Sequence, residues 1–226
     1  MSDRVCGVCG TPVRAAFRAP APEIAPDLDM RPGEPTRSTL RDWIAACPKC
    51  TAAAPDLAAL PPTARPVVES EAYRMLSTTA SEETLPFRRW ALICEQTGDR
   101  AQQAEALLQA AWAADDAAAM SEPANLRQQV AALWADTTDT ELGLRRLDVL
   151  RRAGQFDQAA AWAATLIERG PDELAATIIA FQRARIAQRD VGRHLISSAL
   201  PPPSHQPHVS HGKRATTGFW SRLLKK

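Results

Sequence analysis

The sequence predicts a mainly α-helical protein, in which a small N-terminal module precedes an antiparallel helical bundle and a disordered tail. Alanine supplies 43 of the 226 residues, and it has the highest helix propensity. Eleven of the 18 prolines lie in residues 1–66, and only three lie in residues 67–200. Because proline breaks helix interiors, the middle of the chain can be helical and its flanks largely cannot. We expect a module over residues 1–51, a linker over 52–66, a helical domain over 67–200 and a tail over 201–226.

Composition and charge limit the class of protein. Leu, Ile, Val and Phe together number 43, so the helices share a thin core. The formal charge of +1 conceals a tail with five Lys or Arg and no Asp or Glu. We find neither a transmembrane run of about 18–20 apolar residues nor a signal peptide. We therefore expect a cytoplasmic protein.

Seven stretches of the middle segment carry an apolar stripe at helical spacing. The first is expected to start after Pro66, and Gly98, Gly154 and Gly170 are expected to end later helices. Ser121 has the character of an N-cap, and Thr138 forms capping-box spacing with a glutamate three residues on. In chain order, the stripes are Val68–Leu76, Trp90–Cys94, Ala104–Ala111, Leu126–Trp134, Leu144–Leu150, Ala159–Ile167 and Leu174–Ile186.

Two joints are short enough to force antiparallel helical hairpins, one at Gly98 and one at Gly154. The second hairpin carries Gly154, Phe156, Ala159 and Pro171 at offsets that match the tetratricopeptide pattern. The two glycines are 56 residues apart, whereas that repeat has about 34. The spacing predicts a compact tetratricopeptide-like bundle with an extra helix between two hairpins.

The tryptophans of the helical segment have two possible roles. In an alanine-rich bundle, large rings fill the gaps that small side chains leave. Alternatively, one or two rings line a groove that holds a partner's peptide, and Trp112 and Trp162 are the candidates for that role. Core packing is the expected role, but periodicity cannot separate the two. The four residues concerned are Trp90, Trp112, Trp134 and Trp162.

Two CxxC pairs carry the strongest chemical signal in the chain. Cys6 and Cys9 form the first pair, and Cys47 and Cys50 form the second. Two such turns can supply the four thiolates of a tetrahedral zinc site. This predicts a zinc-ribbon-like module around one structural zinc ion. The proline-rich stretch between the pairs is expected to be a loop, with a strand over Leu40–Ala46 presenting the second pair.

Other interpretations of the cysteines are weaker. A redox pair of the thioredoxin type needs a βαβ surround that this sequence lacks. A catalytic zinc needs an open ligand position, and four sulfur ligands leave none. The fifth cysteine, Cys94, lies on an apolar stripe and is expected to be a small buried side chain.

The cysteine pairs and three later segments resemble a bacterial family of domains of unknown function. The segments are Leu92–Asp99, Leu107–Trp112 and Leu150–Ala159. Members of that family join a zinc-ribbon-like head to tetratricopeptide-like helices. The resemblance covers about residues 5–50 and 85–195, and the alanine- and proline-rich segment Ala52–Pro66 departs from it. It implies this fold, metal binding through Cys6, Cys9, Cys47 and Cys50, and no established activity.

Nothing in the sequence predicts catalysis. The four histidines, His194, His205, His208 and His211, all lie late in the chain, and no nucleophile, phosphate-loop or dinucleotide motif is present. The terminal segment 218–226 is cationic and amphipathic. Its pattern leaves open docking to a partner, weak contact with an anionic membrane, packing back on the bundle and an inert disordered end.

We therefore expect a noncatalytic, zinc-binding protein-interaction module with an unidentified protein partner. The alternative is a zinc-ribbon factor that associates with nucleic acid. Residues 1–66 carry eight Lys or Arg against seven Asp or Glu, which is a weak basis for binding phosphates. The alternative therefore depends on the basic tail.

Overall fold

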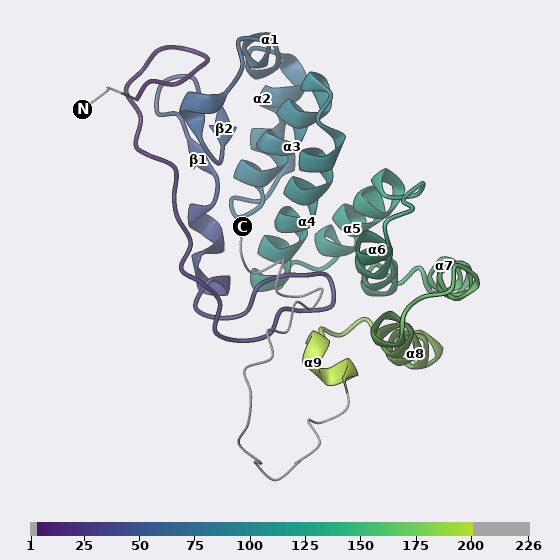
Figure 1. Ribbon diagram of the computed structural model, residues 1–226. Coiled ribbons are helices and arrows are strands. Elements are labelled where there is room, and N and C mark those ends of the chain that lie inside the picture. The colour runs from purple at the N-terminus through teal and green to yellow at the C-terminus, as the bar shows by residue number, and fades with distance from the viewer. Residues whose placement is uncertain (1–3, 201–226) are drawn as a thin grey trace, which may run out of the picture.

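The computed structural model describes residues 4–200, and this part of the chain is mainly helical, as predicted (Figure 1). A head of short elements comes first, and a stack of longer helices follows. The elements in chain order are η1 (Arg37–Asp42), β1 (Ala45–Ala46), β2 (Ala53–Ala54), η2 (Leu57–Ala59), α1 (Ala64–Val68), α2 (Glu71–Thr79), α3 (Leu85–Thr97), α4 (Arg100–Asp116), α5 (Glu122–Leu133), α6 (Thr140–Arg152), α7 (Phe156–Glu168), α8 (Glu173–Ala187) and α9 (Ile196–Ala199).

Most helix ends follow the signals in the sequence. Gly98 ends α3 with φ +82°, and Gly154 lies between α6 and α7 with φ +73°, a left-handed conformation that glycine adopts without a steric penalty. The predicted cap at Thr138 is wrong by one residue. Asp139 caps α6 instead, because its carboxylate accepts a hydrogen bond from the Leu142 backbone N–H at 2.8 Å.

The helices from α3 to α8 each pack against the next in the chain, and α6 also contacts α8. The hairpins α3–α4 and α6–α7 lie on either side of α5, so the extra helix between two hairpins is confirmed. Alanine permits this close stacking: Ala104, Ala110, Ala111 and Ala114 of α4 are fully buried in the main core.

Two expected elements differ from the structure. The first helix is broken in two, because α1 already ends at Val68 and Ser70 caps α2 by accepting the Tyr73 backbone N–H at 3.2 Å. Pro66 lies inside the first turn of α1, where proline is tolerated. The strand expected over Leu40–Ala46 is confined to its last two residues, since η1 extends to Asp42 and takes up the start of that range.

The segment 52–66, expected to be a linker, is folded into the head. It contains β2, which pairs antiparallel with β1, and also η2 and the start of α1. Ala52, Leu57 and Leu60 are buried in a second core that includes Tyr73 and Ile93. The head therefore packs directly on α1–α3.

The tryptophan question is decided in favour of core packing. Trp112, Trp134 and Trp162 are buried, with at most 8% exposed, and Trp90 is half-buried. Trp112 and Trp162 consequently expose too little area to be the main contact surface for a partner. The prediction for Cys94 is confirmed, since its side chain is 1% exposed.

Among residues 4–200, no helix combines the length and the apolar character of a membrane-spanning segment. The predictions for the tail, its three histidines and the segment 218–226 lie outside the described residues.

Candidate metal centre and the buried charge cluster

The four predicted cysteines come together in the head at the ends of two similar turns. In the first turn, the Gly10 backbone N–H donates to the Cys6 carbonyl at 2.8 Å. In the second, the Thr51 N–H donates to the Cys47 carbonyl at 3.0 Å. Gly10 and Thr51, which follow the second cysteine of each pair, both have positive φ. The two CxxC segments therefore fold alike and present their sulfurs to a common centre.

The distances between the sulfurs match a single tetrahedral ion. Cys6 Sγ lies 3.8 Å from Cys50 Sγ, and Cys9 Sγ lies 3.6 Å from Cys47 Sγ. All four Sγ atoms lie within 4.8 Å of one another. Tetrahedral Zn–S bonds of about 2.3 Å would separate the sulfurs by about 3.8 Å. The cysteines are thus unpaired and close enough to hold a metal ion.

The surroundings of the four thiols are unequal. Hydrogen bonding from the Thr11 side chain and backbone lowers the pKa of Cys9 to about 6. Burial raises the pKa of Cys6 and of Cys50 above the usual thiol value. Since metals bind the thiolate form, a metal ion here would displace protons from thiols, the raised Cys6 and Cys50 among them.

The helices support this centre from one side. The Tyr73 hydroxyl, which is buried in α2, donates to the Thr51 carbonyl at 2.9 Å. The Gly7 N–H donates to the Leu57 carbonyl at 2.9 Å, and a Cβ on Gly7 would lie 2.1 Å from the Leu60 carbonyl oxygen. Only glycine fits between the first cysteine turn and this segment, so the metal centre and the helical body are joined through residues 57–60.

A second polar site, which the sequence analysis missed, lies between the head and the helix stack. Residues 23–34 form what we call the insertion loop. Its ends are joined by the Glu23 N–H, which donates to the Glu34 carbonyl at 2.8 Å. Its tip enters the stack beside α9, where the Leu28 N–H donates to the His194 carbonyl at 3.0 Å. Asp27, Leu28 and Asp29 are all at most 3% exposed.

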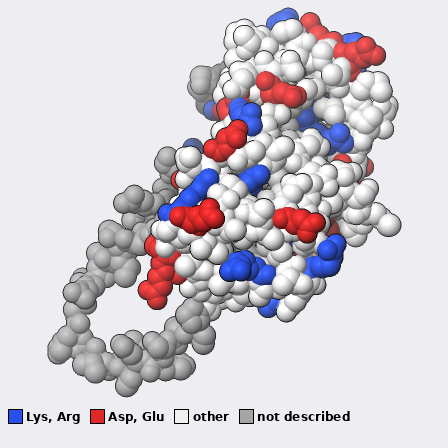
Figure 2. Space-filling model, turned by 90° about the vertical axis from the view of Figure 1, so that its right-hand side faces the viewer, with Lys and Arg blue, Asp and Glu red and all other residues white. Residues whose placement is uncertain are grey.

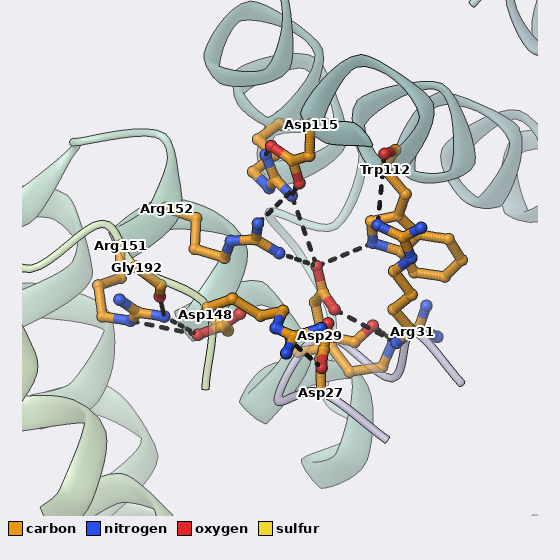
Figure 3. Close-up of polar contacts among 12 residues, drawn as sticks. Asp27, Asp29, Arg31, Trp112, Asp115, Asp148, Arg151, Arg152 and Gly192 are labelled. Carbon is orange, nitrogen blue, oxygen red and sulfur yellow. Dashed lines mark hydrogen bonds and ion pairs between the residues drawn. The ribbon is translucent and has the colours of Figure 1, made fainter. Parts of the chain in front are cut away.

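Asp29 is the centre of a buried charge cluster (Figure 3). Its Oδ2 accepts hydrogen bonds from Trp112 Nε1 at 2.9 Å and Arg152 Nη1 at 3.0 Å. Arg127 Nη2 lies 3.8 Å from the same oxygen. Arg127 and Arg152 also donate to Asp115, at distances of 2.6–3.0 Å. The insertion loop is therefore bound by residues of α4, α5 and α6 at once.

A neighbouring pair fixes the chain that follows α8. Asp148 and Arg151 of α6 are both buried, and Arg151 Nη2 lies 2.6 Å from Asp148 Oδ1. Arg151 also donates to the Gly192 carbonyl at 2.8 Å (Figure 3). Burial raises the pKa of Asp148, and the positive charge of Arg151 only partly offsets this. For Asp29, burial raises the pKa, but the charges of Arg152 and Arg127 hold it below the usual range.

Signals for this cluster were present in the sequence. Asp148 falls within the apolar stripe that runs from Leu144 to Leu150, and Arg151 follows that stripe directly. Arg127 likewise follows a core leucine of α5. Charged side chains at such positions are almost never fully buried unless they are paired. They therefore indicate a partner of opposite charge, although they do not show that it comes from the insertion loop.

Comparison with known proteins finds no family model that matches the chain, no curated protein that is similar in sequence and no solved structure that is similar in fold. The resemblance to a bacterial family of zinc-ribbon-like and tetratricopeptide-like domains therefore stays a prediction.

Proposed function

We propose that this chain is a noncatalytic protein-interaction module whose head folds around one structural zinc ion. The observation that carries the proposal is the closed set of four cysteine sulfurs, packed against the helical body. A structural zinc typically takes four protein ligands, whereas a catalytic zinc keeps one position for water or substrate. The donor set supports a role for the metal in folding.

The head has little else to hold it together. Its strands are two residues long, and the head itself adds only a few large apolar side chains to the second core, such as Val8, Leu57 and Leu60. Such a core cannot offset the entropy of ordering the head without a further source of free energy. A zinc ion bound by Cys6, Cys9, Cys47 and Cys50 would supply it. Thiols stay reduced in the cytoplasm, which suits the location that we expect for this protein.

The charge distribution favours a protein partner over nucleic acid. Residues 4–200 hold 22 Lys and Arg against 25 Asp and Glu. Several of these arginines form ion pairs inside the molecule. Examples are Arg127, Arg151 and Arg152 in the two buried ion-pair groups. On the face shown in Figure 2, basic and acidic side chains are interspersed and do not gather into one basic area. Phosphate binding requires a concentration of free positive charge.

Partner contacts cannot rest mainly on Trp112 and Trp162, which are buried. A recess of about 740 Å³ lies between the proline-rich segment before η1 and the helices α4 and α6. Half-buried Trp43 and several prolines line it. Aromatic and proline side chains are common in grooves that bind extended peptides.

The metal is tested by measuring bound zinc in the purified full chain by mass spectrometry. We expect one zinc per chain, and loss of that zinc in Cys47→Ala. Cys94→Ala is the matched control, because Cys94 is buried but lies outside the cluster. A wild-type chain that folds without metal, or a Cys47→Ala variant that retains it, would refute the structural zinc.

The partner class is tested with tagged wild-type chain incubated in extract of the native host, with and without nuclease. We expect a defined protein to be retained in both cases, and its retention to change little between low and high salt. Retention that disappears with nuclease, or that falls steeply with salt, would favour the nucleic-acid alternative and contradict the proposal.

A further inference from the structure

The recess of about 740 Å³ next to the insertion loop, called here the loop groove, combines apolar walls with carboxylates. Pro20, Pro22 and Met30 form part of one wall, and Trp43 stands against Trp112 with their rings at 90°. Glu105 and Gln109 of α4 and Glu141 and Arg145 of α6 form the opposite side.

The charges of the loop groove leave one carboxylate without a partner. Arg145 is bound to Glu105 through two hydrogen bonds, of 2.7 and 2.8 Å, so these two charges balance. Within residues 4–200, Glu141 accepts no hydrogen bond and forms no ion pair, although it is only partly exposed. A cation with an apolar body would therefore fit this groove better than an anion or a neutral segment would.

The described chain ends beside the loop groove. Ile196 of α9 lines a small adjoining cavity together with Met30, Glu141 and Arg145, and these three residues also line the groove. Leu200, the last described residue, packs against the main core. The 26 residues that follow thus begin within a short distance of the unpaired carboxylate.

We propose that the loop groove binds the basic end of the same chain, Lys213–Lys226. This segment holds five Lys or Arg and no Asp or Glu, and its apolar residues are those that the groove walls would accept. They are Phe219, Trp220, Leu223 and Leu224. Their insertion between Trp43 and the prolines would bring a cation of the segment to Glu141.

The spacer makes binding within one chain favourable. Twelve residues, 201–212, separate the described fold from the segment. A chain of twelve residues spans about 20 Å as a random coil and about 37 Å as an extended polyproline helix. A tether of this length provides an effective concentration in the millimolar range. A weak contact therefore suffices for occupancy, and a partner that uses the groove would have to displace the segment.

The lysines of this chain allow a direct test. There are four, Lys49 in the head and Lys213, Lys225 and Lys226 in the segment. A carbodiimide joins a lysine amine to a carboxylate in contact with it, forming an amide bond, and peptide mass spectrometry identifies both residues. Treatment of the full chain is expected to join a segment lysine to Glu141 or Glu105 as the main product. Cross-links of Lys49 to acids of the head provide an internal measure of reactivity.

Two variants test the contact itself, and a mixture of isotope-labelled and unlabelled chains separates cross-links within one chain from cross-links between chains. Trp220→Ala should lower the yield of the groove cross-links at least threefold, whereas Thr216→Ala should not change it. Cross-links that are spread over many surface carboxylates, or absent from the groove, would overturn the proposal. So would groove cross-links formed mainly between labelled and unlabelled chains, since the occupant would then be a second copy. None of these results requires zinc or a partner, so they are independent of the proposed function.

Discussion

Removal of the Asp29 carboxylate should destabilise the helix stack more than any surface substitution. Asp29 is fully buried and links the insertion loop to α4, α5 and α6. We consider Asp29→Ala, which removes the side chain, and Asp29→Asn, which keeps its shape and an acceptor for Trp112. Asp42→Asn, on the exposed surface of η1, is the matched control.

The size of the effect follows from the geometry. At an effective dielectric constant of about 20, a charge pair at 3.0 Å, as for Arg152, is worth about 5.5 kcal/mol, and one at 3.8 Å, as for Arg127, about 4.4 kcal/mol. Desolvation of the three ions offsets most of this gain in the native protein. Removing one partner keeps the desolvation of the others and loses the attraction, which typically costs about 3–5 kcal/mol.

We therefore expect a loss of about 3–5 kcal/mol in the free energy of unfolding for Asp29→Ala. For Asp29→Asn we expect a loss of about 2–3 kcal/mol, because the Trp112 N–H keeps an acceptor. Asp42→Asn should change it by less than about 0.5 kcal/mol. Urea unfolding followed by tryptophan fluorescence measures all three. If both Asp29 variants unfold within about 0.5 kcal/mol of the wild type, the cluster does not hold the loop in place and our reasoning fails.

Three further predictions concern the head, the charge cluster and Cys94. Gly7→Ala should lower the unfolding free energy of the head by about 1–3 kcal/mol and weaken zinc retention, because its Cβ would lie 2.1 Å from the Leu60 carbonyl oxygen. An unchanged melting temperature would contradict this. The fold lowers the pKa of Asp29, so the stability that its carboxylate contributes is present above the unfolded pKa of about 3.9 and is lost as pH falls through the folded pKa. The difference in unfolding free energy between wild type and Asp29→Asn should therefore narrow below about pH 4. A difference that widens there would be inconsistent with the cluster. Burial raises the pKa of Cys94 to about 12, so alkylation of Cys94 should be much slower in the native chain than in the unfolded chain. Mass spectrometry measures both rates, and equal rates would show that α3 opens readily.

Local signals in the sequence predicted the helix stack well. The left-handed glycines at 98 and 154 end or separate helices because the backbone conformation at those points is nearly specific to glycine. The cap of α6 was assigned one residue early, since Thr138 and Asp139 are both good capping residues and the choice depends on where the helix packs. The break at Ser70 had a signal too, because serine followed by glutamate is a typical helix start.

The four cysteines could be assigned to one site because two CxxC turns have few alternatives in a chain of this kind. The position of the head relative to the helices could not be predicted. It depends on alanines and leucines of residues 52–60, whose composition resembles that of a linker and whose role is decided by contacts with Tyr73 and Ile93. Small apolar residues carry little information about their partners in a single sequence.

The insertion loop shows a different limit. Prolines at positions 26 and 32 correctly indicate a nonhelical segment, but they do not distinguish a solvated loop from a buried one. The distinction depends on side chains more than 80 residues away, since Asp29 is 83 residues from Trp112 and 123 from Arg152. No local pattern can contain that information.

The length of this separation has a consequence for the protein during its synthesis. A chain grows from its N-terminus at about 5–20 residues per second, so the 123 residues between Asp29 and Arg152 take roughly 6–25 s to make. The four cysteines are complete as soon as Cys50 has emerged, long before the arginines exist. A head that closes early around its metal would hold both ends of residues 10–46 together and lower the entropy cost of docking the loop later. The metal would then determine the order in which the two halves of the molecule assemble, as well as the final shape of the head.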